Sequence, residues 1–268
     1  MAADTIRIIA RGDDAGSSVT ANRAIQEAIS CGFLRNVSLM ACCGAIEDAA
    51  DRFAPHAEVC FGLHATLNAE WDDVRWGPVL PPEHVPSLVD REGMFFQTVA
   101  ALAVHGPQVE EVMAELQAQL NRLRALGFHI SYADMHMDFS KAIPGFEAEF
   151  DDWCSREGLI NAIPYYRNWI TTVYAHLTPY AIERNDDPIG AVIHELDQLK
   201  PGEYLIVGHP AYDNAEMRNL GHAGYTGDRV SSGRHWERLL FTDPRILAFV
   251  QAKGIVPIRY DEAEDGSR

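Results

Sequence analysis

The chain has 268 residues, a length that α/β barrels commonly reach as one domain. Hydrophobic residues make up 47% of it, a share typical of a globular protein, which excludes an extensively disordered chain. Lys and Arg number 22 against 39 Asp and Glu, giving a formal net charge of −17, and so acidic a surface repels nucleic acid and anionic lipid. We therefore expect a small-molecule substrate, with neither nucleic acid nor a membrane as partner.

The cysteines and the start of the chain predict a cytoplasmic protein. Five cysteines are present, an odd number without a CxxC spacing, and most stand in apolar surroundings, so we expect reduced core residues. The first residues, MAADTIRIIARGDD, contain no apolar stretch long enough for a signal peptide. No window of the sequence approaches the length and apolarity of a membrane span.

Taken in order, short apolar runs alternate with segments of helical period. The runs predict seven strands, at residues 6–10, 37–42, 59–67, 130–136, 163–166, 204–208 and 255–260. The periodic segments predict helices at residues 19–31, 45–53, 109–126, 146–158, 188–199 and 244–253. Such alternation indicates an α/β fold in which crossover helices join the strands of a parallel sheet.

Two segments interrupt the alternation. Residues 68–106 are rich in Pro and aromatic residues and have no clear period, and residues 211–232 are rich in Gly and Asn. Segments of this length without a period are typical of functional loops. Neither resembles a linker between domains, so we expect a single catalytic domain over residues 1–268 with long loop insertions at 68–106 and 211–232.

Polar side chains gather where predicted strands end. Parallel strands deliver the residues at their carboxyl ends to one edge of a sheet or one mouth of a barrel, where active sites are built. These residues are Asp13 and Asp14 after the first strand, His64 in the third, Asp134 and His136 at the end of the fourth, and His209 after the sixth. We expect them to lie close together although they are distant in sequence.

This set has the composition of a catalytic metal site. One carboxylate and two imidazoles, here Asp14, His64 and His136, are ligands typical of a divalent ion that keeps positions open for water and substrate. Adjacent side chains leaving a strand point in different directions, so Asp13 is free to accept a proton from the water that such an ion activates. His209 is then the candidate acid that protonates the leaving group.

Each of these residues also has a structural alternative. Asp14 or Ser17 can cap the helix that follows. An imidazole inside an apolar strand, such as that of His64, is often a hydrogen-bonded core group, and His209 before a proline can belong to a turn. What favours the catalytic interpretation is the shared position at strand ends.

Motifs spread along the chain resemble the YdjC-like carbohydrate deacetylases, also called the ChbG family. The segments that carry the resemblance are GDDAG with TANRAIQEAI, then NVSLMAC, GLHATL, VPSLVDREGMF, ADMHM and GHPAY. The resemblance implies a single-domain (β/α) barrel-like fold similar to that of polysaccharide deacetylases. It also implies one divalent metal ion, Mg²⁺ in this family with Zn²⁺ as the alternative. It assigns the ion to Asp14, His64 and His136, the base to Asp13 and the acid to His209.

The chain departs from the family pattern in the strand-four motif. The family has DSHxHxH there, whereas this chain keeps the first histidine as His136 and carries Asp138 and Ser140 in place of the later two. The resemblance therefore implies a retained metal ligand and an altered sugar pocket, in which Asp138 would favour a substrate that bears an amine. The family also has a bulky aromatic residue where this chain has Ala15.

Together these observations predict a metal-dependent hydrolase that removes the N-acetyl group from an amino sugar or a short chito-oligosaccharide. Aromatic faces stack on sugar rings, so the expected substrate contacts are Trp71, Trp76 and Tyr212 together with the carboxylates Asp134 and Asp138, although the tryptophans can equally pin the loop to the barrel. The alternatives are another metallohydrolase on the same scaffold and a sugar-binding or regulatory protein without turnover. The resemblance also implies a homodimer.

Overall fold

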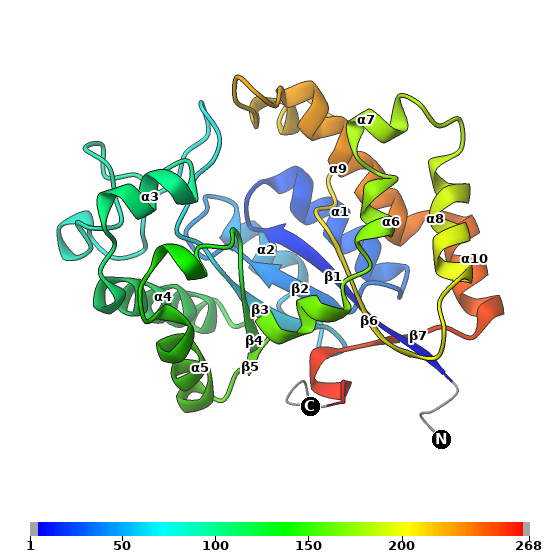
Figure 1. The fold of residues 1–268 in the computed structure, drawn as a ribbon, viewed down its shortest axis with the longest axis horizontal. Helices are drawn as coiled ribbons and strands as arrows, with labels where there is room; N and C mark the ends of the chain where they lie inside the picture. Colours follow the sequence, from blue (N-terminus) through cyan, green and yellow to red (C-terminus); the bar gives the residue numbers. More distant parts are fainter. Residues whose placement is uncertain (1–4, 265–268) are drawn as a thin grey trace.

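A computed structural model describes residues 5–264. Its strands form one parallel sheet in the order β5-β4-β3-β2-β1-β6, and β7 pairs with the first half of β1 (Figure 1). The bounds are β1 Ile6–Ala15, β2 Asn36–Leu39, β3 Cys60–Ala65, β4 Ile130–Met135, β5 Ile160–Asn161, β6 Gly202–Gly208 and β7 Val256–Ile258. The predicted number of strands and their parallel pairing are confirmed.

Six helices lie where the apolar period predicts them, and all begin and end within two residues of the predicted bounds. They are α1 Val19–Ser30, α2 Ile46–Phe53, α4 Val109–Ala125, α5 Phe146–Glu157, α8 Pro188–Asp197 and α10 Pro244–Lys253. Four further helices were not predicted, namely α3 Val99–His105, α6 Thr171–Ala175, α7 Pro179–Ile182 and α9 Gly227–Thr242. Within the described part of the chain, no helix combines the length and the apolar composition needed to cross a bilayer.

The predicted strand at residues 163–166 is wrong. These residues form the 3₁₀ helix η3, Ile163–Asn168, and the strand β5 is only two residues long and precedes it. Pro164 has no N–H to donate, which disfavours a ladder at this place. The chain after η3 instead bridges to β6 at Trp169 and Leu205, so that an irregular segment fills the gap between the two edges of the curled sheet.

Alternating residues of β1 face the two sides of the sheet. Ile8 and Ala10 belong to the large core between the sheet and its helices, whereas Ile9 belongs to a smaller core inside the curl, with Tyr132 and Tyr260. By the same period of two, Arg11 faces the interior of the curl, where it is fully buried. A cation therefore lies directly beneath the carboxyl ends of the strands.

The two predicted loops are partly helical. The first contains α3 and is anchored to α4, where the buried Glu115 carboxylate accepts hydrogen bonds from the backbone N–H groups of Val79 and Leu80 at 2.8 and 3.0 Å. The second ends earlier than predicted, because α9 begins at Gly227. The Gly and Ser residues in its first turns have weak helix propensity, which hid this helix from sequence reasoning.

Candidate active site and metal centre

A bulge near the end of β1 positions the two adjacent carboxylates. Gly12 pairs with Val37 of β2 and Ala15 pairs with Leu39, so β1 contains one extra residue between these pairs. The extra residue is accommodated at Asp14, whose backbone lies in the left-handed region at φ 64°. Asp adopts this conformation more readily than most residues. The sequence prediction placed Asp13 and Asp14 after the strand and pointing apart. They lie within it, and the bulge brings both toward His64.

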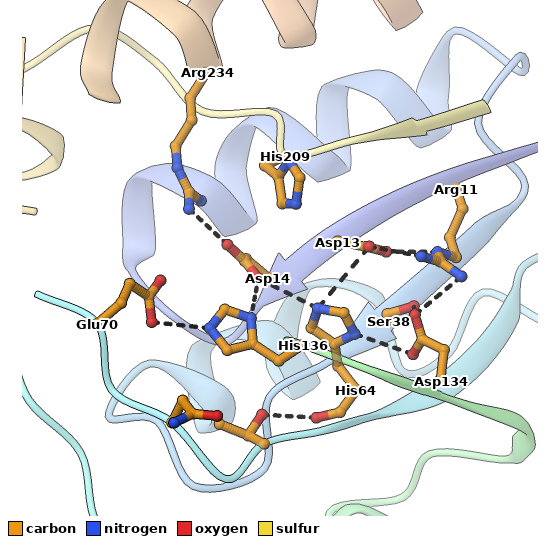
Figure 2. A network of polar contacts seen from close by, with 12 residues as sticks. Arg11, Asp13, Asp14, Ser38, His64, Glu70, Asp134, His136, His209 and Arg234 are labelled. Carbon is orange, nitrogen blue, oxygen red and sulfur yellow. Dashed lines mark hydrogen bonds and ion pairs between the residues drawn. The ribbon is translucent and has the colours of Figure 1, made fainter. Parts of the chain in front are cut away.

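The register between β3 and β4 sets the position of His64. His64 lies beside Asp134 in the parallel ladder, and its Nδ1 is 3.0 Å from the Oδ1 of that carboxylate. The contact leaves Nε2 directed at the bulge, 3.4 Å from Asp14 Oδ1 and 3.9 Å from Asp13 Oδ2 (Figure 2). Burial lowers the pKa of His64, but the charges of Asp134 and Asp13 outweigh this effect and raise the pKa to about 9.

His136 stands one residue beyond β4 and faces the same carboxylate from another side. Its backbone N–H extends the ladder by donating to Ala65, and its Nδ1 lies 3.1 Å from Asp14 Oδ1. Its Nε2 lies 3.0 Å from Glu70 Oε2, in the first long loop. Each imidazole thus has a carboxylate behind it, the arrangement that orients histidine ligands at metal sites.

The donor atoms of Asp14, His64 and His136 lie within 4.8 Å of one another. His64 Nε2 is buried and has no hydrogen-bond partner among residues 5–264, and an ion would supply one. Asp13, His64 and Asp134 form a second cluster of this kind, but Arg11 already binds both oxygens of Asp13 and one of Asp134, whereas Arg234 binds a single oxygen of Asp14. The residues therefore fit one divalent ion at the first cluster.

Arg11 organises the base of the site. It donates from Nε and Nη2 to both oxygens of Asp13, at 2.7 and 2.8 Å, and its Nη1 lies 3.0 Å from Asp134 Oδ2. The hydroxyls of Tyr166 and Tyr260 accept its remaining hydrogen bonds, at 2.6 and 3.0 Å. Burial raises the pKa of Asp134, but the charges of Arg11 and His64 outweigh it and hold this pKa below the usual range.

His209 follows β6, whose last residue Gly208 pairs with Gly12 of β1, so His209 stands beside the bulge. Its Nδ1 is 2.8 Å from Glu237 Oε2 of α9, and both residues line a pocket of about 310 Å³ together with Asp14 and His136. Burial lowers the pKa of His209, but the charge of Glu237 outweighs it and raises this pKa above the ordinary value. One turn before Glu237, Arg234 donates from Nη2 to Asp14 Oδ2 at 2.7 Å (Figure 2).

Several predicted substrate contacts lie elsewhere. Asp134 is fully buried behind His64 and cannot meet a ligand. The Tyr212 hydroxyl donates to Glu27, and its ring lies against Arg238, outside the pocket. Asp138 also lies outside the pocket, where its carboxylate accepts hydrogen bonds from the backbone N–H and the hydroxyl of Ser140.

The two tryptophans differ in their roles. Trp71 lines the pocket, but His222 stacks on its ring at 6.1 Å and little of the residue is exposed. Trp76 is buried beside His136 and donates from Nε1 to the backbone oxygen of Asn68 at 2.7 Å. Trp76 therefore anchors the first loop to the barrel. The sequence had left this alternative open for both tryptophans.

Sequence reasoning did not assign four polar residues that complete the site. Arg11 stands two residues before the acidic pair, and a cation this close to two carboxylates at the end of a buried strand could have drawn attention to it. Glu70, Arg234 and Glu237 lie on a loop and on the unpredicted helix α9, so their approach to the site depends on chain packing that no local pattern reports.

Comparisons with known proteins place the chain in a family. A family model described as YdjC-like protein matches residues 7–252. The chain belongs to the YdjC-like family. A relative from Thermoanaerobacter pseudethanolicus named carbohydrate deacetylase is 25% identical over 267 residues, covering 94% of this chain and 97% of that protein. A second relative with this name, from Brevibacillus brevis, is 32% identical over 131 residues, covering 49% of each chain.

Solved structures show that the YdjC-like chain has the fold expected of it. A protein from Enterococcus faecalis, described as a candidate cellobiose-phosphate cleavage protein, aligns with a TM-score of 0.72 at 20% identity, over 96% of this chain and 98% of that one. A CE4 esterase from Streptococcus mutans aligns with a TM-score of 0.50 at 12% identity, over 97% and 87%. The predicted family and the barrel-like α/β fold are confirmed.

Proposed function

We propose that this chain is a metal-dependent deacetylase that removes the N-acetyl group from an amino sugar or a short chito-oligosaccharide. The observation that carries the proposal is the convergence of Asp14, His64 and His136 on one point, with Asp13 beside it and His209 lining the same pocket. Membership of the YdjC-like family and relatives named carbohydrate deacetylase support the choice of substrate.

The residues divide the reaction between them. Asp14, His64 and His136 would hold the ion, which when bound lowers the pKa of a water and polarises the amide carbonyl. Asp13 takes one proton from the water that adds to the acyl carbon, and the fork of Arg11 fixes both carboxylate oxygens for that task.

His209 completes the hydrolysis. Its Nδ1 faces Glu237, which leaves the other ring nitrogen to donate a proton to the amide nitrogen as the carbon–nitrogen bond breaks. Water has then been added across the bond, and acetate and the free amine leave. Because Glu237 raises the pKa of His209, the imidazole stays protonated to a higher pH than an ordinary histidine does.

The ion and the cellular location also belong to this proposal. The family resemblance favours Mg²⁺, whereas two imidazoles and one carboxylate form a ligand set typical of catalytic Zn²⁺, so both ions are to be tested. The free cysteines among residues 5–264 support a reducing, cytoplasmic environment. The homodimer and the single catalytic domain over residues 1–268 remain predictions.

A direct test measures acetate released from N-acetylglucosamine and from N-acetylated chito-oligosaccharides of two to four sugars, with and without a chelator. We expect release from at least one substrate, loss on chelation and recovery with one of the two ions. Asp13→Asn should abolish release while its metal content stays that of the wild type, and Asp197→Asn, which loses only a surface pair with Lys253 outside the pocket, should retain activity. Release that persists in Asp13→Asn would remove Asp13 from its role, and absence of release from all substrates would overturn the proposal.

A further inference from the structure

One buried donor in the pocket is not explained by the roles assigned so far. The Arg234 side chain is nine-tenths buried, and its Nη2 is engaged by Asp14. Its Nη1 is also buried but has no hydrogen-bond partner among the residues that the structure describes. An unpaired guanidinium N–H in such a place is unfavourable, and natural sites keep one where a ligand completes the bonding.

The position of Arg234 indicates which part of a ligand this donor would meet. Arg234 and Glu237 lie one turn apart on α9, and both line the pocket; Glu237 reaches His209 while Arg234 reaches Asp14. Figure 2 shows the guanidinium group directed toward Asp14, with His209 beside it. The unpaired Nη1 thus belongs to a side chain that lines the same pocket as Asp14 of the ion site and His209, the proposed acid.

The protein groups around Arg234 do not provide a substitute partner. Trp71 presents its ring at 5.9 Å from the guanidinium carbon, a contact that stabilises the charge but accepts no directed hydrogen bond. The charge of Glu237 acts on Arg234, yet its carboxylate bonds to His209. A molecule bound in the pocket is placed to supply the acceptor for Nη1.

We propose that Arg234 Nη1 donates a hydrogen bond to the acyl oxygen of the scissile amide, which makes Arg234 a catalytic residue. The inference rests on the proposed function. In this proposal the scissile amide binds with its carbonyl oxygen on the Asp14 side of the pocket, where Arg234 lies. When water adds to the acyl carbon, the carbonyl electron pair moves onto this oxygen, and a fixed cationic donor stabilises the developing charge. The charge returns to the carbonyl bond as the amine leaves.

The test separates this role from simple support of Asp14. Arg234→Lys keeps a positive charge near Asp14, and Arg234→Ala removes both donors; each is assayed for acetate release and, by calorimetry, for affinity toward Mg²⁺ and Zn²⁺. Arg238→Lys is the matched control, because Arg238 is one turn further along α9 and pairs with Glu27 outside the pocket. Circular dichroism verifies that each variant is folded.

We expect kcat at saturating ion to fall about 100- to 1,000-fold in both Arg234 variants, with KM within a few fold of the wild type, and guanidinium chloride to restore part of the loss in Arg234→Ala. Arg238→Lys should keep kcat. A loss that saturating ion fully restores, or kcat within three-fold of the wild type, would overturn the assignment. Wild-type protein that releases no acetate would instead remove the proposed function, and this assignment with it.

Discussion

Replacing Arg11 by Met should destabilise the protein severely, because this one cation serves two buried carboxylates. It binds Asp13 through two hydrogen bonds and lies 3.0 Å from Asp134, and both carboxylates are buried. Removing one partner of a buried ion pair costs about 3–5 kcal/mol. Since Arg11 neutralises two charges, we expect a loss of free energy of unfolding near the upper end, about 4–5 kcal/mol.

That loss is a large part of the total stability of a typical domain, about 5–15 kcal/mol. Urea unfolding in the presence of a chelator measures it. The pKa of Asp134 is lowered in the folded protein, so its contribution to stability is present above the unfolded pKa and disappears as the pH falls through the folded pKa. Without Arg11 a buried carboxylate can take up a proton and lose its charge. The difference in free energy of unfolding between the wild type and Arg11→Met should therefore become smaller from pH 7 to pH 5.

Arg52 offers a matched control for Arg11. It also forms two hydrogen bonds to one carboxylate, that of Asp48, at 2.8 and 2.9 Å, but on the surface, where its side chain is 27% exposed. Exposed pairs contribute about 0.2–1 kcal/mol, so Arg52→Met should lose no more than that. If Arg11→Met were to lose no more free energy of unfolding than Arg52→Met, the view that Arg11 organises the site would be wrong.

Three other changes test the pocket. Glu237→Gln should lower the pKa of His209 and move the alkaline limb of the profile of kcat/KM against pH to lower pH; an unmoved limb would separate Glu237 from the acid. Glu70→Gln should weaken ion binding about 10- to 100-fold in calorimetry, because it leaves His136 without its orienting carboxylate; unchanged affinity would contradict this. Tyr212→Phe should leave KM unchanged in steady-state assays, whereas a marked rise would return Tyr212 to the substrate site.

The sequence predicted the parts of the fold that depend on local pattern. Apolar periods located six helices and six strands, since one buried face imposes its period on the residues of an element. The predicted strand at residues 163–166 is wrong, because this apolar, aromatic run forms a 3₁₀ helix that fills a gap in the barrel. The sequence failed again at α9, whose first turns are poor in helix-forming residues and whose packing against the sheet decides its conformation.

For the candidate site, the rule that parallel strands present their carboxyl ends together was sufficient to bring His64 and His136 to Asp14. It could not foresee the bulge in β1, because an extra residue in one strand appears only against the register of its neighbour. Nor could it tell a pocket residue from a buried partner. Asp134 stands at a strand end like the others, yet its pairing with Arg11 places it behind the site.

We expect amide hydrolysis to require one ion, held by Asp14, His64 and His136. The most direct test is to remove bound metal from the protein with a chelator and then add Mg²⁺ or Zn²⁺ stepwise. Bound metal and acetate release are measured in the same samples. We expect acetate release to rise in proportion to the amount of bound ion and to stop rising at one ion per chain. His136→Ala should lose both the bound ion and the acetate release. Full acetate release from protein with no bound ion would contradict this expectation.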